Sequence, residues 1–168
     1  MKIFFLLLII TASTYSQSSF IKTSGNKFTL NNDDFKFLGF NAYYFQSEAG
    51  DTGKRYIVDD VFYSAKNIGV DVIRTWAFYE SSSFSNPSVI RRGPYEIQES
   101  GLIALDYLLY KARENGIYLI LTISNNYSAF GGIPQYINWA NQVKLDGSNN
   151  HTHNDFFMIG ALQHFIFY

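Results

Sequence analysis

Cysteine is absent from the 168 residues. The chain can therefore form no disulfide framework, carry no catalytic thiolate and hold no cysteine-ligated metal. A charge excess of either sign is also absent, because 13 Lys and Arg residues nearly balance 14 Asp and Glu residues, the net charge is −1, and there is neither a basic run nor an acidic tail. Nucleic acid and anionic membrane surfaces are not indicated as partners. The remaining composition, 47% apolar and 16% charged residues, is typical of a folded globular protein.

The apolar run near the N-terminus, residues 3–10, is too short to span a bilayer. It follows Met1 and Lys2 and precedes small and polar residues over 11–16. This is the layout of a secretory signal peptide, so we expect residues 1–16 to be removed and the protein to be secreted, with no membrane anchor in the mature chain.

Aromatic residues are abundant, with 16 Phe, 13 Tyr and 2 Trp. Flat rings suit sugar-binding or protein-binding surfaces because they stack and bury a large area. A large core would use them equally well, so composition alone leaves both interpretations open.

The first part of the chain predicts β-structure. Residues 28–30 and 35–37 alternate apolar and polar side chains around the polar residues 31–34, which predicts a small β-hairpin. Residues 38–44 are then predicted to form a buried strand, in which Gly39 allows close backbone approach.

Two later segments predict helices followed by strands. Apolar residues at helical spacing end at Gly69 and again at Gly116, and apolar stretches follow over 70–78 and 117–123. A serine-rich loop is expected between the strand over 70–78 and the second helix, and a short helix over 133–140. The repeated helix–glycine–strand unit indicates a βα array with a parallel sheet covered by helices.

No Gly-X-Gly-X-X-Gly follows any predicted strand, which argues against a dinucleotide-binding Rossmann fold. The array therefore favours an α/β fold that is a partial (β/α)8 barrel, with about three βα units preceded by the hairpin. A full barrel usually needs about 250 residues.

Barrel enzymes place their chemistry where strands end. The three predicted strand ends, residues 39–44, 74–78 and 124–127, carry aromatic and amide groups, and the second also carries an arginine. Rings stack on the apolar faces of a pyranose, while amides and guanidinium groups bind hydroxyls. The strand ends therefore indicate a carbohydrate-binding cleft.

At these residues the sequence resembles glycoside hydrolase family 5, and within it the endo-β-1,4-mannanases. The resemblance covers roughly residues 20–157, and its stretches occur in the order of the family: 20–23, 28–31, 39–43, 74–78, 101–109, 124–127, 131–136 and Trp139. It implies a retaining hydrolase of internal β-1,4-mannosidic bonds in mannan, working without a metal or organic cofactor through two glutamates about 5–5.5 Å apart.

The family's acid/base glutamate follows an asparagine, yet this chain contains no Asn-Glu pair. Its five glutamates are Glu48, Glu80, Glu96, Glu99 and Glu114. We assign Glu48, Glu80 and Glu96 to loops and the other two to a helix, and we interpret Glu80 as a solvated loop charge. The chain by itself is thus expected to be inactive.

By resemblance, Arg74 matches the barrel arginine that hydrogen-bonds the nucleophile, where a guanidinium would keep the carboxylate ionised. The alternative is a structural ion pair. Trp76, Asn125, Tyr127 and Tyr44 are the candidate substrate-binding residues, and for Trp76 packing below the cleft is an equal alternative. Tyr43 is expected to support the core or a loop, and Gln135, Tyr136 and Trp139 to pack the third loop.

His151, His153 and Asp155 could hold a metal, but a polar loop is the favoured interpretation because no further ligands cluster there. Residues 158–168 form an apolar tail that no longer resembles the family. We therefore expect a signal peptide over 1–16, barrel over 17–157, a divergent tail over 158–168, and a gene product truncated before its catalytic residues. The alternative functions are a non-catalytic carbohydrate-binding remnant and a related β-glucan or xylan hydrolase.

Overall fold

A computed structural model describes residues 20–83, 85–158 and 160. The predicted signal peptide and nearly all of the apolar tail lie outside the described residues. The chain divides between Lys36 and Phe37 into two compact units, which are described separately. Among the described helices, none is both long and apolar enough to cross a membrane.

The first unit is a three-stranded antiparallel sheet made of β1 (Lys22–Ser24), β2 (Lys27–Leu30) and β3 (Asp33–Asp34). The predicted hairpin is present between β2 and β3, but its turn is shorter than predicted. Leu30 pairs with Asp33, so that only Asn31 and Asn32 form the turn, both at positive φ. Asparagine tolerates this conformation, which matches the twist of the flanking strands. The strand β1 is additional to the predicted pair.

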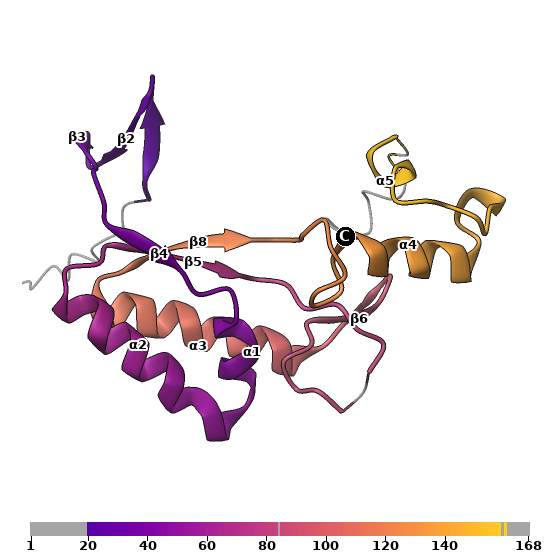
Figure 1. The fold of residues 1–168 in the computed structure, drawn as a ribbon, viewed down its shortest axis with the longest axis horizontal. Coiled ribbons are helices and arrows are strands. Elements are labelled where there is room, and N and C mark those ends of the chain that lie inside the picture. The colour runs from indigo at the N-terminus through magenta and orange to yellow at the C-terminus, as the bar shows by residue number, and fades with distance from the viewer. Residues whose placement is uncertain (1–19, 84, 159, 161–168) are drawn as a thin grey trace, which may run out of the picture. The chain divides into compact units, whose positions relative to one another are not determined.

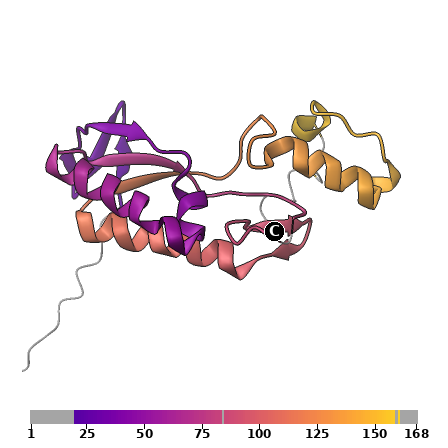
Figure 2. The same ribbon diagram turned by 60° about the horizontal axis from the view of Figure 1, so that its bottom comes forward.

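The second unit is built on a parallel sheet of β4 (Gly39–Asn41), β5 (Val72–Trp76) and β8 (Tyr118–Thr122), in that order. Helix α2 (Arg55–Asn67) connects β4 to β5, and α3 (Glu99–Asn115) connects the segment after β5 to β8. Both helices lie on the same face of the sheet (Figures 1 and 2). The predicted βα array is confirmed, and with it the α/β class.

Both long helices end at the predicted glycines. Gly69 and Gly116 have φ of 77° and 69°, in the left-handed region where a residue with a side chain is strained. The next backbone groups turn back at once, because the amide of Val70 donates to Ala65 and that of Ile117 to Ala112. This shared C-terminal geometry is why the two junctions are alike in sequence.

The core lies between the sheet and its helices. Its buried members come from α1, α2, α3 and β5 and from residues next to the strands: Ala42, Phe45, Ala49, Val58, Phe62, Ala65, Val70, Ile73, Ala104, Leu108, Ala112 and Ile117. Burying such side chains is the main stabilising contribution to the unit, at about 25 cal/mol per Å² of apolar surface removed from water.

The strand β4 is exposed rather than buried, so this part of the sequence prediction is wrong. Among the described strands it pairs only with β5. Its Asn41 is in register with Arg74 and Ile120. Because Ile73 and Leu119 pack toward the helices, alternation places Arg74 and Ile120 on the opposite, uncovered face of the sheet.

Several short elements complete the second unit. Helix α1 (Phe45–Gly50) and the 3-10 helix η1 (Thr52–Lys54) precede α2, so Glu48 lies in a helix rather than in a loop. The predicted serine-rich loop contains a small hairpin of β6 (Arg91–Gly93) and β7 (Glu96–Ile97), which places Glu96 in a strand.

After β8 come α4 (Gly132–Val143), the 3-10 helix η2 (Leu145–Gly147) and α5 (Asp155–Met158). The predicted helix over 133–140 is confirmed as the centre of α4. A second, smaller core forms here around the buried Tyr136 and Trp139, with Ile133, Ile137, Ala140 and Phe156. The expected packing role of Tyr136 and Trp139 is thereby confirmed.

Candidate functional site

The parallel sheet brings the ends of β4, β5 and β8 to one edge (Figure 1). Arg74 is exposed there, and its Nη1 donates to Oδ1 of Asn41 across the paired strands at 2.9 Å. Among the described residues, no carboxylate lies within ion-pair distance of Arg74. The guanidinium is thus oriented by an amide and keeps further donors for a ligand.

Trp76 ends β5 inside an aromatic cluster. Its ring centroid lies 5.0 Å from Tyr43, 4.9 Å from Phe78 and 5.2 Å from Phe130. Centroid separations of this size are typical of favourable ring contacts. The indole is half-buried, so it packs against neighbours and still presents part of its surface at the strand ends.

Two adjacent tyrosines, Tyr43 and Tyr44, differ from expectation in their exposure. Tyr44, a candidate substrate-binding residue, packs against the main core and contacts Phe45 at 5.5 Å. Tyr43, expected to support the core or a loop, is 45% exposed and lies beside Trp76. The strand end therefore presents the ring of Tyr43 rather than that of Tyr44, while a substrate contact by either tyrosine stays a prediction.

Asn125 holds the loop that follows β8. Its Oδ1 accepts from the amide of Tyr127 at 2.7 Å, and its Nδ2 donates to the carbonyl of Ala129 at 2.9 Å. These contacts fix the course of the loop. Tyr127 is 75% exposed as a result, and its ring is open to a ligand.

Glu80 is buried, and its interpretation as a solvated loop charge is wrong. The residue is 3% exposed. Its Oε2 accepts from the amide of Gly132 at 3.0 Å and its Oε1 accepts from the hydroxyl of Tyr136 at 2.8 Å. The backbone amide of Glu80 also donates to the carbonyl of Phe130 at 2.9 Å. The carboxylate therefore joins the loop after β5 to the start of α4.

Burial raises the pKa of Glu80 from 4.5 to about 7, because a carboxylate loses its hydration there. The hydrogen bonds from Gly132 and Tyr136 and the positive charge of Arg91 act in the opposite direction and are outweighed. Burial likewise raises the pKa of Tyr136, helped by the adjacent Glu80 charge. In the sequence, the pair Gly131 and Gly132 was the one signal that a backbone segment approaches the carboxylate of Glu80 closely.

The two histidines in the described residues, His151 and His153, have partners within the fold. His151 is buried, with Nε2 3.1 Å from the carbonyl of Leu145 and 3.3 Å from Oδ1 of Asp146. Nε2 of His153 lies 2.7 Å from Oδ1 of Asn126. Over the described part of the chain, no group of three or more His, Cys, Asp or Glu side chains is arranged to hold a metal ion.

Comparison with known proteins gives consistent matches. A family model described as glycoside hydrolase family 5, β-mannosidase-like, matches residues 18–165. Mannan endo-1,4-β-mannosidase 4 of Solanum lycopersicum is 36% identical over 143 residues, which are 85% of this chain and 34% of the relative. Mannan endo-1,4-β-mannosidase 7 of Arabidopsis thaliana is 34% identical over 146 residues, covering 87% of this chain and 32% of that protein.

Solved structures agree with these matches. The endo-1,4-β-mannanase of Rhizomucor miehei has a TM-score of 0.65 and 31% identity, over 88% of this chain and 39% of its own. The hyperthermostable endo-1,4-β-D-mannanase of Thermotoga petrophila RKU-1 has a TM-score of 0.65 and 28% identity, over 79% and 36%. The chain thus spans about a third of the length of the curated relatives that it matches.

Proposed function

Because this chain belongs to the β-mannosidase-like group of glycoside hydrolase family 5, we propose that it forms the first part of a (β/α)8 barrel that hydrolyses internal β-1,4-mannosidic bonds in mannan. In this proposal β4, β5 and β8 are the first three barrel strands. The candidate cleft lies at their carboxyl ends, where barrel enzymes bind their substrates. A polysaccharide substrate is in keeping with export through the predicted signal peptide, so secretion is part of the proposal.

The observation that carries the proposal is the placement of Arg74. It lies on the uncovered face of β5, the central described strand, two residues before that strand ends, and its guanidinium is bonded to Asn41 at 2.9 Å. The rings of Trp76, which ends the strand, and Tyr43 contact each other at 5.0 Å. A guanidinium in this position can hydrogen-bond a carboxylate and lower its pKa, which favours the ionised nucleophile of a retaining mechanism. The rings offer apolar faces to a pyranose.

The two glutamates of the reaction are not evident among the five in this chain. Retention requires an acid/base and a nucleophile facing each other across the glycosidic bond, about 5–5.5 Å apart. Glu80, which follows the end of β5, accepts a hydrogen bond from Gly132 at Oε2 and from Tyr136 at Oε1, so both carboxylate oxygens are already engaged. We therefore propose that the 168-residue chain by itself binds mannan without cleaving it, which is the second candidate function.

Tyr127 provides the test of mannan binding. Replacing Tyr127 with alanine removes a ring that is 75% exposed and should weaken retention of the chain on immobilised mannan by about 5–10-fold, since stacked aromatic contacts contribute about 1 kcal/mol or more. The matched control is Tyr63→Ala, which removes a ring of similar exposure, 67%, from helix α2. Affinity electrophoresis in mannan measures binding, and reducing-sugar release measured in parallel detects cleavage.

The same binding measurement with cellulose and with xylan tests whether mannan is the preferred polysaccharide. Binding to mannan that exceeds binding to cellulose and xylan supports the proposal, whereas stronger binding to either of the others assigns the chain to a β-glucan or xylan hydrolase. Equal retention of the Tyr127→Ala and Tyr63→Ala variants would remove the strand-end cleft from the proposal. Release of reducing sugar by the purified chain would contradict binding without turnover.

A further inference from the structure

Two segments of the second unit have the form Asn-X-Ser/Thr, namely residues 126–128, Asn-Tyr-Ser, and residues 150–152, Asn-His-Thr. This pattern is the acceptor for N-linked glycosylation in proteins of the secretory pathway. The attached sugar needs open space, so a modified asparagine has to lie at the surface of the folded chain. Because so short a pattern also arises by chance, the surroundings of each segment have to decide between them.

The second segment connects η2 to α5, and its side chains alternate in exposure. Asn150 and Thr152 are exposed, whereas His151 between them is only 7% exposed. Such alternation is typical of an extended segment, in which the side chains of residues i and i+2 point the same way. The acceptor amide and the hydroxyl that the pattern requires therefore share the outer side of this segment.

His151 anchors the segment to α4. Its backbone amide donates to Oδ1 of Asn141 at 2.7 Å, and Nδ2 of Asn141 donates back to the carbonyl of His151 at 3.0 Å. The imidazole Nε2 also lies 3.1 Å from the carbonyl of Leu145. Because His151 is held on the inner side by these contacts, Asn150 and Thr152 stay on the outer side.

The side-chain nitrogen of Asn150 is the atom that glycosylation modifies. Oδ1 of Asn150 accepts from the hydroxyl of Ser148 at 2.6 Å, and its backbone amide donates to the same hydroxyl at 3.4 Å. Over the described part of the chain, Nδ2 of Asn150 has no hydrogen-bond partner. A sugar attached to this nitrogen would therefore break no hydrogen bond of the fold.

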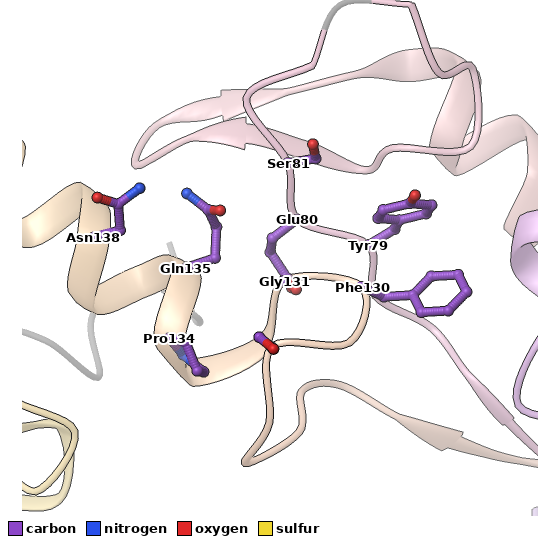
Figure 3. Close-up of a pocket in the computed structure, with 9 residues that line it drawn as sticks. Tyr79, Glu80, Ser81, Phe130, Gly131, Pro134, Gln135 and Asn138 are labelled. Carbon is purple, nitrogen blue, oxygen red and sulfur yellow. The ribbon is translucent and has the colours of Figure 1, made fainter.

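The first segment has different surroundings. Oδ1 of Asn126 lies 2.7 Å from Nε2 of His153. Its hydroxyl residue, Ser128, lines a pocket of about 410 Å³ together with Phe130 (Figure 3). Between them lies Tyr127, whose ring the proposed function assigns to mannan. A sugar attached to Asn126 would thus stand next to a candidate substrate-binding residue, which favours Asn150 as the modified residue.

We propose that Asn150 is a site of N-linked glycosylation. In this reaction Nδ2 of Asn150 forms an N-glycosidic bond to the anomeric carbon of an oligosaccharide carried on a polyprenyl pyrophosphate. The bond from that carbon to the pyrophosphate oxygen breaks, the polyprenyl pyrophosphate leaves with the electron pair, and Nδ2 gives up one proton. Glycosylation at Asn150 rests on the proposed function in one respect, because the chain has to be exported to meet the transferase.

The test uses the whole 168-residue chain, produced in eukaryotic cells that glycosylate exported proteins. Peptides from cells and medium together are treated with peptide N-glycosidase in water labelled with a heavy oxygen isotope, which converts a glycosylated asparagine to labelled aspartate. Mass spectrometry then identifies the modified residue. We expect label at Asn150, and its complete loss in Asn150→Gln and in Thr152→Ala. Label should remain in Thr152→Ser, which keeps the hydroxyl of the pattern.

The matched control is Asn126→Gln, which removes the other acceptor amide and should leave the label at Asn150. Thr152→Ala also loses a hydrogen bond from the hydroxyl of Thr152 to Asp155, whereas Asn150→Gln leaves that bond in place. The melting temperature of Asn150→Gln should equal that of the enzymatically deglycosylated parent, because the substituted side chain is exposed. Loss of the label then reflects the missing acceptor and not a misfolded chain.

A second form of the chain, with an established secretory leader in place of residues 1–16, separates the acceptor site from export. Label at Asn150 in this form alone supports the site and contradicts export by the native N-terminus, which belongs to the proposed function. Absence of label at Asn150 from both forms would overturn the site. Label at Asn126 on chains that are retained on mannan would count against the strand-end cleft and leave the assignment of Asn150 unchanged.

Discussion

Replacing Glu80 with alanine is expected to lower the free energy of unfolding by about 3–5 kcal/mol. The change leaves the buried amide of Gly132 and the hydroxyl of Tyr136 without their acceptor and opens a cavity. Each orphaned buried group costs about 1–3 kcal/mol. Urea denaturation followed by tryptophan fluorescence measures the loss, since Trp139 lies in the small core that contains Tyr136.

The control for this change is Glu99→Ala, which removes an exposed glutamate from the first turn of α3. Its expected cost is less than about 1 kcal/mol, from the lost interaction with the helix dipole. Similar losses in the two variants would show that the buried carboxylate does not join the loop after β5 to α4.

The charge of Glu80 makes stability depend on pH. Its pKa is raised in the folded chain from 4.5 to about 7, so between these values the folded state binds more protons than the unfolded state. The stabilising contribution of the protonated form is therefore complete below about pH 4.5 and is lost as pH rises to about 7, by at most about 3 kcal/mol.

Glu80→Gln should abolish this part of the pH dependence. The glutamine carbonyl can accept from Gly132, its amide can donate to the rotatable hydroxyl of Tyr136, and neither group titrates. Unfolding free energies measured from pH 5 to 8 should thus fall more steeply for the parent chain than for the variant. Parallel curves would mean that burial does not raise the pKa of Glu80.

Gly132→Ala is expected to destabilise the chain by more than about 3 kcal/mol. Gly132 has a φ of 59°, and a Cβ added there would collide with the carbonyl of Tyr127 and the side chain of Asn125, and would lie 2.8 Å from the carbonyl of Asn125. Left-handed strain alone costs about 1–2 kcal/mol. The additional cost arises because the neighbouring atoms belong to a loop fixed by its own hydrogen bonds.

Gly147→Ala isolates the strain from the collision. Gly147 has a φ of 84° and nothing within 4 Å of an added Cβ, so its loss should stay near 1–2 kcal/mol. Thermal and urea unfolding of both variants measure the difference. If Gly132→Ala is no worse than Gly147→Ala, the close contact between α4 and the loop after β8 is relaxed in solution.

The elements of the second unit could be predicted because their signals are local. Helical spacing ending at Gly69 and Gly116, followed by apolar runs, determined α2, β5, α3 and β8. Each helix ends with a residue in the left-handed conformation, which glycine adopts without strain, so the helix end can be recognised from the sequence alone. The exposure of β4 was not visible, because it depends on which strands lie beside it.

The candidate site likewise contains residues that could be predicted from the sequence and an arrangement that could not. The residue types and their positions after strands were sufficient to single out Arg74, Trp76 and Tyr127, because parallel strands must end at a common edge. Which of Tyr43 and Tyr44 faces Trp76 was decided by packing around α1.

The sequence by itself determined the α/β array, the strand ends and the family, since periodicity, turn residues and motifs act over short distances along the chain. Only the tertiary structure decided the state of Glu80. The two groups that donate to its carboxylate, the amide of Gly132 and the hydroxyl of Tyr136, lie 52 and 56 residues away in sequence. Whether a carboxylate is solvated or buried depends on atoms brought to it by the fold, and no local pattern around residue 80 records them.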